Sequence, residues 1–319
     1  MTNRAALALL TLLLSLPAQA AEPPVPAFEV LERLSPVDPL PERETRWNHP
    51  GVTLTALTYS TVPGYRPLRL DLYRQAGSTA ARPLVVFIHG GGWTFGNPRS
   101  GAGFRDFPAI LASLTERGFV VAAIEYRFSR EAVFPAQRDD VTAALAYLRT
   151  NATLLGIDPA RIALWGLSAG AHLGALNALT CGQAPCVQGF AGWFGVYDMG
   201  VHIADSEGAT RSRALLGCAT TPCSPETLAA ASPIDHVRSG APPVLLVHGL
   251  DDTDVQPGQS QDFARRLREA GNAVDLVLVP RSGHGFIGGS TAETQRALQE
   301  ALTATFDFFE RVLRPAPAR

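Results

Sequence analysis

The 319-residue sequence lacks an excess of charge of either sign and contains little charge altogether. Charged residues make up 18% of it, the formal net charge is −2, and the pI is about 6.4. Such a surface has no broad attraction to the phosphates of nucleic acid or to anionic lipid, so we expect neither as a partner. With 46% hydrophobic residues, the composition is that of a folded globular protein that buries a large core.

Long hydrophobic runs are also lacking after residue 20. Residues 1–20, MTNRAALALLTLLLSLPAQA, combine one arginine, an apolar stretch from Ala5 to Leu16 and a small-x-small sequence ending at Ala20. This apolar stretch is shorter than the ~20 residues that cross a bilayer. We therefore expect a signal peptide cleaved near Ala20, a secreted or periplasmic mature chain, and no stable membrane anchor.

Cysteine is scarce. The four cysteines form two local pairs, Cys181 with Cys186 and Cys218 with Cys223. In an exported protein this spacing favours two short-loop disulfides, although four cysteines allow three pairings. Zinc thiolate sites usually have tighter spacing and nearby histidines, so we expect no metal.

The chain after residue 20 divides into two regions. Residues 21–50 are rich in proline and predict an N-terminal arm before a single folded domain at 51–319. Residues 52–60 and 68–73 predict an antiparallel hairpin joined by a Pro-Gly turn. Six short apolar runs follow: LVVFIH (84–89), FVVAAIE (119–125), IALW (162–165), GFAGWF (189–194), PVLLVH (243–248) and VDLVLV (274–279).

These runs are separated mostly by segments with helical patterns, which we place at 105–117, 136–150, 169–180, 259–270 and 291–313. Wholly apolar strands between helices are typical of a sheet covered on both faces. The pattern predicts an α/β fold with a mostly parallel, doubly wound sheet of about eight strands and flanking helices. Residues 196–241 interrupt this alternation of apolar runs and helical segments. They predict either a small lid on the substrate side or a surface loop closed by a disulfide.

Ligands bind beyond the carboxyl ends of the strands in such a sheet, so the polar residues after each run are informative. Ser168 follows one run, three aspartates (Asp251, Asp252 and Asp254) follow another, and His284 follows the last. A serine nucleophile needs a histidine base and an acid that orients it. The order Ser, Asp, His on one rim predicts this unit, and spacing alone leaves the choice of aspartate open.

Two glycine motifs complete the predicted site. Ser168 is the apex of GLSAG, a Gly-x-Ser-x-Gly turn between strand and helix. The sequence FIHGGGW at 87–93 ends an earlier strand with three glycines, whose amides can point into the site. We predict an oxyanion hole formed by the amides of Gly91, Gly92 and Ala169. Trp93 is a candidate substrate-pocket residue, with a purely core role as the alternative.

Other polar residues in these motifs have structural explanations. His89 and His248 each end a strand before glycine, and we expect hydrogen-bonded scaffold roles for both. His172 is expected to pack beneath the turn that carries the serine. Asp139 and Asp140 lie at or within a helix start, where capping and loop anchoring account for them.

Together these motifs resemble the α/β-hydrolase superfamily, and within it the esterases of the hormone-sensitive-lipase and feruloyl-esterase-like (BD-FAE) groups. The resemblance spans roughly residues 54 to 313 and rests on VVFIHGGGW, FPAQRDDVTAALAYLR, GIDPARIALWGLSAGAHL, SPIDHV, PPVLLVHGLDDTDV and SGHGF. It implies the α/β-hydrolase fold and assigns the nucleophile to Ser168, the base to His284 and the acid to Asp252. It also implies carboxylic ester hydrolysis without a metal or organic cofactor.

Two departures from the family pattern bear on the substrate. Ala171 stands where many relatives have glycine, and the cysteine-bearing insertion is not part of the common pattern. We predict an exported serine carboxylesterase that acts through an acyl-enzyme on small-molecule esters with a short acyl chain or a polar alcohol. The alternatives are an amidase or peptidase on the same fold, or a non-catalytic binding scaffold, although such scaffolds usually lose a triad residue or an oxyanion glycine.

Overall fold

The structure, a computed structural model, describes residues 45–46, 51–78, 80–180, 187–205 and 209–314, all within the unit Val37–Arg319. The predicted signal peptide, most of the predicted arm and the Cys181–Cys186 pair lie outside these residues. Among the helices that are described, none is long and apolar enough to cross a membrane.

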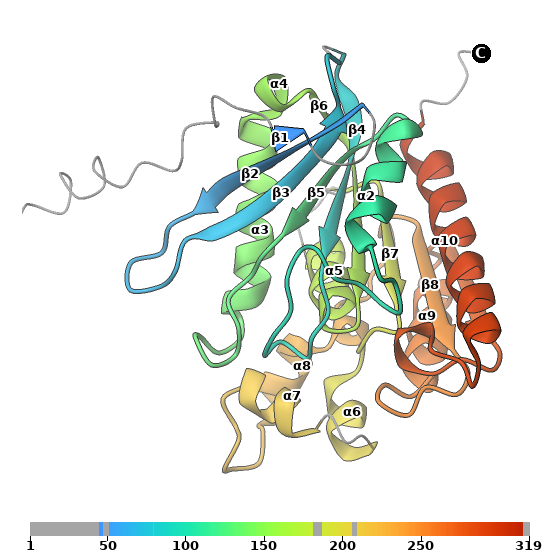
Figure 1. The fold of residues 1–319 in the computed structure, drawn as a ribbon. Coiled ribbons are helices and arrows are strands. Elements are labelled where there is room, and N and C mark those ends of the chain that lie inside the picture. The colour runs from blue at the N-terminus through green and yellow to red at the C-terminus, as the bar shows by residue number, and fades with distance from the viewer. Residues whose placement is uncertain (1–44, 47–50, 79, 181–186, 206–208, 315–319) are drawn as a thin grey trace, which may run out of the picture. The chain divides into compact units, whose positions relative to one another are not determined.

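The apolar runs form the strands of one mostly parallel sheet, in the order β1-β2-β3-β5-β4-β6-β7-β8-β9 (Figure 1). Only the first three pairings, β1 with β2, β2 with β3 and β3 with β5, are antiparallel. The strands are β1 (Thr45–Arg46), β2 (Val52–Ser60), β3 (Leu68–Gln75), β4 (Arg82–Ile88), β5 (Val120–Ile124), β6 (Ile157–Leu167), β7 (Gly189–Trp193), β8 (Val244–Gly249) and β9 (Val274–Val279).

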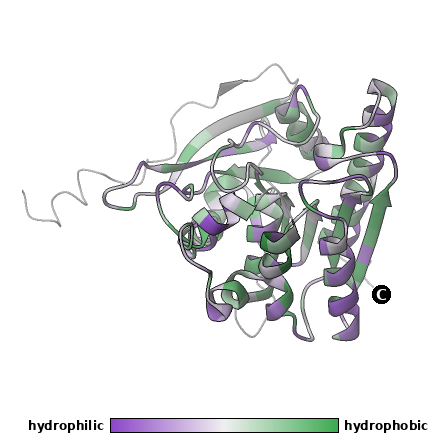
Figure 2. Cartoon of the chain, turned by 90° about the horizontal axis from the view of Figure 1, so that it is seen from below, coloured by the Kyte–Doolittle hydropathy of each residue, from purple (hydrophilic) through white to green (hydrophobic). Residues whose placement is uncertain are grey.

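Helices cover both faces of the sheet, and the two faces carry separate hydrophobic clusters because successive side chains of a strand point to opposite sides. Helices α3, α5 and α9 pack on one face, and α2 and α10 pack on the other. In Figure 2 the strands are mostly green, whereas the flanking helices alternate green and purple. The sheet helices are α2 (Phe107–Glu116), α3 (Ala136–Thr150), α4 (Ala152–Leu155), α5 (Ala169–Thr180), α9 (Gly258–Glu269) and α10 (Thr291–Leu313).

The predicted fold class is confirmed, with each predicted strand and long helix present at or near its expected position. Two differences concern strand edges. Thr45–Arg46, within the predicted arm, pairs with β2 and makes the sheet nine strands. Strand β6 begins at Ile157, ahead of the apolar run, because Ile157 pairs with Arg82 across a register shift. The residues between, such as Asp158 and Ala160, are partly or fully exposed, so hydrophobicity does not mark them.

The described part of the insertion at 196–241 forms four short helices. The three that Figure 1 labels lie beyond the carboxyl ends of the parallel strands. A disulfide joins Cys218 to Cys223, as predicted for that pair. The helices of the insertion are α6 (Met199–Asp205), α7 (Ala209–Leu215), α8 (Pro225–Ala231) and the 3-10 helix η1 (Pro233–His236).

Candidate active site

Ser168 occupies the sharp turn between β6 and α5 with a φ of +52°, a conformation that few non-glycine residues adopt. Both flanking glycines are required by close packing. A Cβ at Gly170 would lie 2.1 Å from the carbonyl oxygen of Ile88, and one at Gly166 would lie 2.3 Å from the carbonyl oxygen of Gly170. The Gly-x-Ser-x-Gly sequence therefore lets α5 begin directly against β4 and β6 while the serine stands at the apex.

The structure brings together the serine, histidine and one aspartate that the sequence placed after three different strands. Nε2 of His284 lies 3.1 Å from Oγ of Ser168, and Nδ1 of His284 lies 2.8 Å from Oδ2 of Asp252. His284 opens the 3-10 helix η2 (His284–Phe286) after β9, and its ring contacts Phe194 at 4.7 Å. Because a carboxylate only accepts hydrogen bonds, Nδ1 carries the proton and Nε2 is left to accept the serine hydroxyl.

Asp252 is held as an ionised carboxylate. It is 2% exposed, and its Oδ1 accepts the backbone N–H groups of Asp254 and Val255 at 3.0 and 2.9 Å. Burial by itself would raise the pKa of Asp252, but hydrogen bonds from His248 and His284 outweigh it and lower the pKa to about 2. The site therefore keeps a negative charge beside the imidazole at neutral pH.

Sequence reasoning treated His248 as scaffold and missed its contact with this carboxylate. Nε2 of His248 donates to the carbonyl of Val255 at 2.8 Å and lies 3.3 Å from Oδ2 of Asp252. Nδ1 of His248 lies 2.7 Å from Oγ of Ser260, which fixes the ring. Of the three candidate aspartates in the described chain, Asp251 and Asp254 are exposed, and Asp252 alone bonds to His284.

Gly91 and Gly92 of the predicted oxyanion hole line the same cavity as Ser168, and Ala169 directly follows the serine in the chain. Gly91 has a φ of +117°, and a Cβ there would lie 2.0 Å from the carbonyl oxygen of Phe95, so position 91 admits no side chain. Gly92 also has a positive φ, +56°. Ala169 is the first residue of α5, where backbone N–H groups have no acceptor within the helix and carry the positive end of its dipole.

Trp93 lines the cavity beside Ser168 and is only 2% exposed, so its side chain belongs both to the cavity wall and to the hydrophobic core. Its φ is +58°, and hydrogen bonds fix both its backbone and its indole ring. The carbonyl of Trp93 accepts the N–H of Ser129 at 2.8 Å, and its indole N–H donates to Nδ1 of His172 at 3.1 Å. Nε2 of His172, fully buried under the turn as predicted, lies 2.7 Å from the carbonyl oxygen of Ala231 in α8.

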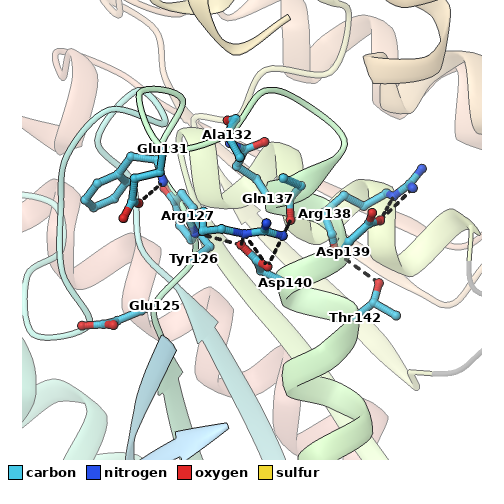
Figure 3. Close-up of polar contacts among 12 residues, drawn as sticks. Glu125, Tyr126, Arg127, Glu131, Ala132, Gln137, Arg138, Asp139, Asp140 and Thr142 are labelled. Carbon is cyan, nitrogen blue, oxygen red and sulfur yellow. Dashed lines mark hydrogen bonds and ion pairs between the residues drawn. The ribbon is translucent and has the colours of Figure 1, made fainter. Parts of the chain in front are cut away.

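The loop that supplies Ser129 is anchored by a buried ion pair, drawn in Figure 3. Asp140 of α3 accepts the backbone N–H of Arg127 at 2.9 Å and binds its guanidinium at 2.7 Å, with side chains 3% and 12% exposed. The neighbouring Asp139 instead pairs with Arg138 at the surface. Asp140, and not Asp139, therefore anchors the loop.

A cavity of about 820 Å³ opens over Ser168. The insertion contributes Val196, His202, Thr210 and Arg211 to its wall, and sequence reasoning singled out none of these four. Burial, followed by the nearby charge of His284, lowers the pKa of His202 to about 4. The remaining lining residues are Gly90, Gly91, Gly92, Trp93, Phe95, Gly96, Asn97, Ser100, Gly101, Ala102, Leu167, Ser168, Phe194, Asp254, Val255, His284 and Gly285.

His89, as expected, and the buried Trp193 have structural roles. His89 is 1% exposed, with Nδ1 2.7 Å from the carbonyl oxygen of Gly90, and Trp193 is a fully buried core residue that donates to Thr305. Within the described part of the chain, no three His, Cys, Asp or Glu side chains are grouped so that they could hold a metal ion.

A serine at a strand-to-helix turn, paired with a histidine and an aspartate on this sheet, defines the α/β-hydrolase class. The BD-FAE family pattern matches residues 70–267, more than half of the sequence. The chain therefore belongs to the BD-FAE family.

Similar proteins carry the names of esterases. Esterase LipQ of Mycobacterium tuberculosis (strain ATCC 25618 / H37Rv) is 32% identical over 266 residues, which cover 76% of this chain and 59% of LipQ. The chain spans about 60% of the length of the first curated relatives that it matches.

Two solved structures are similar over most of the chain. A truncated carbohydrate esterase from gut microbiota is 27% identical with a TM-score of 0.67, covering 81% of this chain and 95% of that one. The propionate-bound esterase Est2 of Thermogutta terrifontis is 26% identical with a TM-score of 0.67, covering 84% and 98%.

Proposed function

We propose that the protein is a serine carboxylesterase that acts through an acyl-enzyme. The observation that carries this proposal is the continuous line from Oγ of Ser168 through both ring nitrogens of His284 to Oδ2 of Asp252, at 3.1 and 2.8 Å. A serine hydroxyl is a weak nucleophile until a base within hydrogen-bond reach takes its proton. The names of the similar proteins support the same reaction class.

In the first half-reaction, Oγ of Ser168 bonds to the ester carbonyl carbon as its proton passes to Nε2 of His284. The carboxylate of Asp252 stabilises the imidazolium that forms. The carbonyl π electrons move to the oxygen, and the negative charge is received by the amides of Gly91 and Gly92.

The amide of Ala169 completes this oxyanion hole from the other side of the serine. The C–O bond to the alcohol then breaks, and His284 returns its proton to the departing oxygen. Water repeats the sequence on the acyl-enzyme: it gives a proton to His284, attacks the carbonyl, and releases the acid and free Ser168.

The substrates that we propose are esters with a short acyl chain or a polar alcohol. Support comes from the cavity, which has Asn97, Ser100, Thr210, Arg211 and Asp254 among its lining residues, so it offers hydrogen-bonding groups to a polar alcohol portion. Two similar structures, a carbohydrate esterase and an esterase with bound propionate, support this choice.

The test is hydrolysis of a p-nitrophenyl ester series from acetate to palmitate by the wild-type protein and by Ser168→Ala, with p-nitroacetanilide as the amide counterpart. We expect activity that falls with chain length and is lost in the variant, whose thermal unfolding matches wild type. Activity that survives Ser168→Ala would overturn the role of Ser168. Preferred cleavage of the anilide would favour an amidase, and no turnover at all would favour a binding scaffold.

We further propose export to a periplasm or to the medium, on the basis of the N-terminal pattern MTNRAALALLTLLLSLPAQA and the disulfide between Cys218 and Cys223. N-terminal sequencing of the protein recovered from fractionated expression cells tests this. A chain that begins near Ala21 outside the cytoplasm is expected, and an intact leader on cytoplasmic protein would contradict it.

A further inference from the structure

The cavity wall contains the guanidinium of Arg211, which has no role in the proposed mechanism. Arg211 lies on α7, in the insertion, and lines the cavity together with Ser168. We propose that Arg211 binds a carboxylate carried by the substrate, so that the preferred esters are anionic. This inference rests on the proposed esterase function and names a substrate class for it.

Arg211 lies directly against the oxyanion turn. A Cβ built at Gly92 would be 2.6 Å from Cδ of Arg211 and 3.5 Å from both Nε and Nη1. The guanidinium is therefore next to the second glycine of the predicted oxyanion hole. A substrate whose carbonyl oxygen enters that hole has its neighbouring atoms within reach of this charge.

The guanidinium has a second contact in the cavity wall. Its Cζ lies 5.6 Å from the centre of the Phe95 ring, in a cation–π arrangement. Phe95 is 56% exposed and lines the same cavity, and Arg211 is itself exposed, so the stacked guanidinium is accessible to a ligand. An arginine placed in this way has lost part of its rotamer freedom before any substrate arrives.

Arg211 differs in its partners from Arg66 and Arg127. Arg66 pairs with Glu125 and Glu131, and Arg127 pairs with Asp140. Across the residues that the structure describes, the side chain of Arg211 forms neither an ion pair nor a hydrogen bond, so its five N–H donors are available. Their planar fork matches the two oxygens of a carboxylate.

The other ionisable groups in the cavity wall also favour a substrate anion beside Gly92. Asp254, two residues after the predicted catalytic acid, is exposed on the acid side of the triad and would repel a carboxylate there. His202 and His284 are the remaining ionisable residues among the described lining residues, and Arg211 is the one with a permanent positive charge. An anionic substrate group is therefore favoured beside Gly92 and disfavoured beside Asp254.

The test uses two pairs of esters in which a carboxylate is replaced by a carboxamide of nearly the same shape. Monoethyl succinate and ethyl succinamate place the group on the acyl portion, whereas acetoxyacetate and acetoxyacetamide place it on the alcohol portion. Titration of the released acid at pH 7.5 gives kcat/KM for the wild type, Arg211→Gln and Arg211→Lys. Arg213→Gln is the matched control, because it removes the same charge from the same helix at a residue that does not line the cavity.

We expect the wild type to prefer the carboxylate over its amide partner by about tenfold in at least one pair, as for a partly solvated bidentate ion pair. Arg211→Gln should abolish this preference, Arg211→Lys should keep part of it, and Arg213→Gln should keep all of it. The pair that shows the preference identifies the portion of the substrate that carries the charge.

Neutral amide-bearing esters that are hydrolysed without any preference for the anions would overturn the inference and leave the esterase function standing. An equal loss on both members of each pair in Arg211→Gln would also overturn it, because Arg211 would then support the fold or the reaction rather than the charge. No hydrolysis of any ester by the wild type would instead be a failure of the proposed function.

Discussion

Trp93 donates its indole N–H to Nδ1 of His172 across 3.1 Å, although 79 positions separate the two residues in the sequence. The same imidazole uses Nε2–H to bind the carbonyl of Ala231 at the end of α8. One ring nitrogen accepts and the other donates, which only a neutral imidazole can do. Burial lowers the pKa of His172 to about 4, so this neutral form is maintained at pH 7. Trp93, the residue after the predicted oxyanion glycines, is thereby connected to the insertion.

His172→Phe is predicted to lower kcat by about tenfold and to change KM for p-nitrophenyl acetate much less. The change leaves the Trp93 N–H and the Ala231 carbonyl buried without partners, which frees the turn that holds Gly92. Outright loss of one oxyanion donor costs about 10²- to 10³-fold, so its displacement should cost less. Steady-state kinetics of the variant measure both constants.

Asn177→Leu is the control for His172→Phe. Asn177 is another buried polar residue of α5, but it bonds to α3 through Thr142 and the Arg138 carbonyl. The Asn177→Leu substitution should lower the free energy of unfolding and leave kcat near the wild-type value. If His172→Phe behaves in the same way, the Trp93 contact serves stability alone.

Asp252→Asn is predicted to lower kcat by about 10⁴-fold while the protein stays folded, since an amide can stabilise the wrong tautomer of His284 and cannot balance its charge. Asp251→Asn is the matched control, because Asp251 is adjacent and exposed and should keep nearly full activity. Initial rates with p-nitrophenyl acetate distinguish them. Comparable losses in the two variants would remove the special role of Asp252.

The sequence predicted the fold well because the signals were local. Each buried strand is a short apolar run, and the serine turn is written in five consecutive residues, with Gly166 and Gly170 needed for contacts that a Cβ would block. The positions of Ser168 and His284 followed from where those strands end. The resemblance to known esterases, rather than spacing, distinguished Asp252 from its neighbours.

The unpredicted parts of the site depend on tertiary packing. Arg211 and His202 come from an insertion without hydrophobic periodicity, and nothing in the residues around them indicates that they face Ser168. The link between Asp140 and the loop beside Trp93 joins segments through a buried ion pair, which two adjacent aspartates in a helix do not reveal. Such contacts become visible only when the chain is folded.

Asp140→Asn is predicted to lower the free energy of unfolding by about 3–5 kcal/mol, because it leaves the mostly buried guanidinium of Arg127 without its counter-charge. Asp139→Asn removes the same charge one residue earlier, where the carboxylate is 53% exposed, and should stay within about 0.5 kcal/mol of wild type. Urea denaturation of both variants measures the difference. Equal effects would mean that the Arg127 pair is not a stabilising anchor.

The last prediction concerns stability against pH. Burial lowers the pKa values of His89, His172 and His202 from 6.5 to about 4. Between pH 6.5 and pH 4 these histidines bind protons in the unfolded chain but not in the folded protein. Their contribution to the free energy of unfolding is therefore complete above pH 6.5 and decreases as the pH is lowered toward 4. Each histidine contributes up to about 1.4 kcal/mol per pH unit in this window.

Urea denaturation at pH 7.5, 6.5, 5.5 and 5.0 measures this slope above the range in which most carboxylates titrate. His89→Asn should lower stability at every pH, because the ring of His89 stacks on Tyr126 at 4.5 Å, but its slope should be shallower by about one proton. The slope is therefore the decisive quantity, since lost packing shifts the whole curve without changing its steepness. A stability that is the same at pH 7.5 and pH 5.0 would show that the folded protein accepts these protons as readily as the unfolded chain.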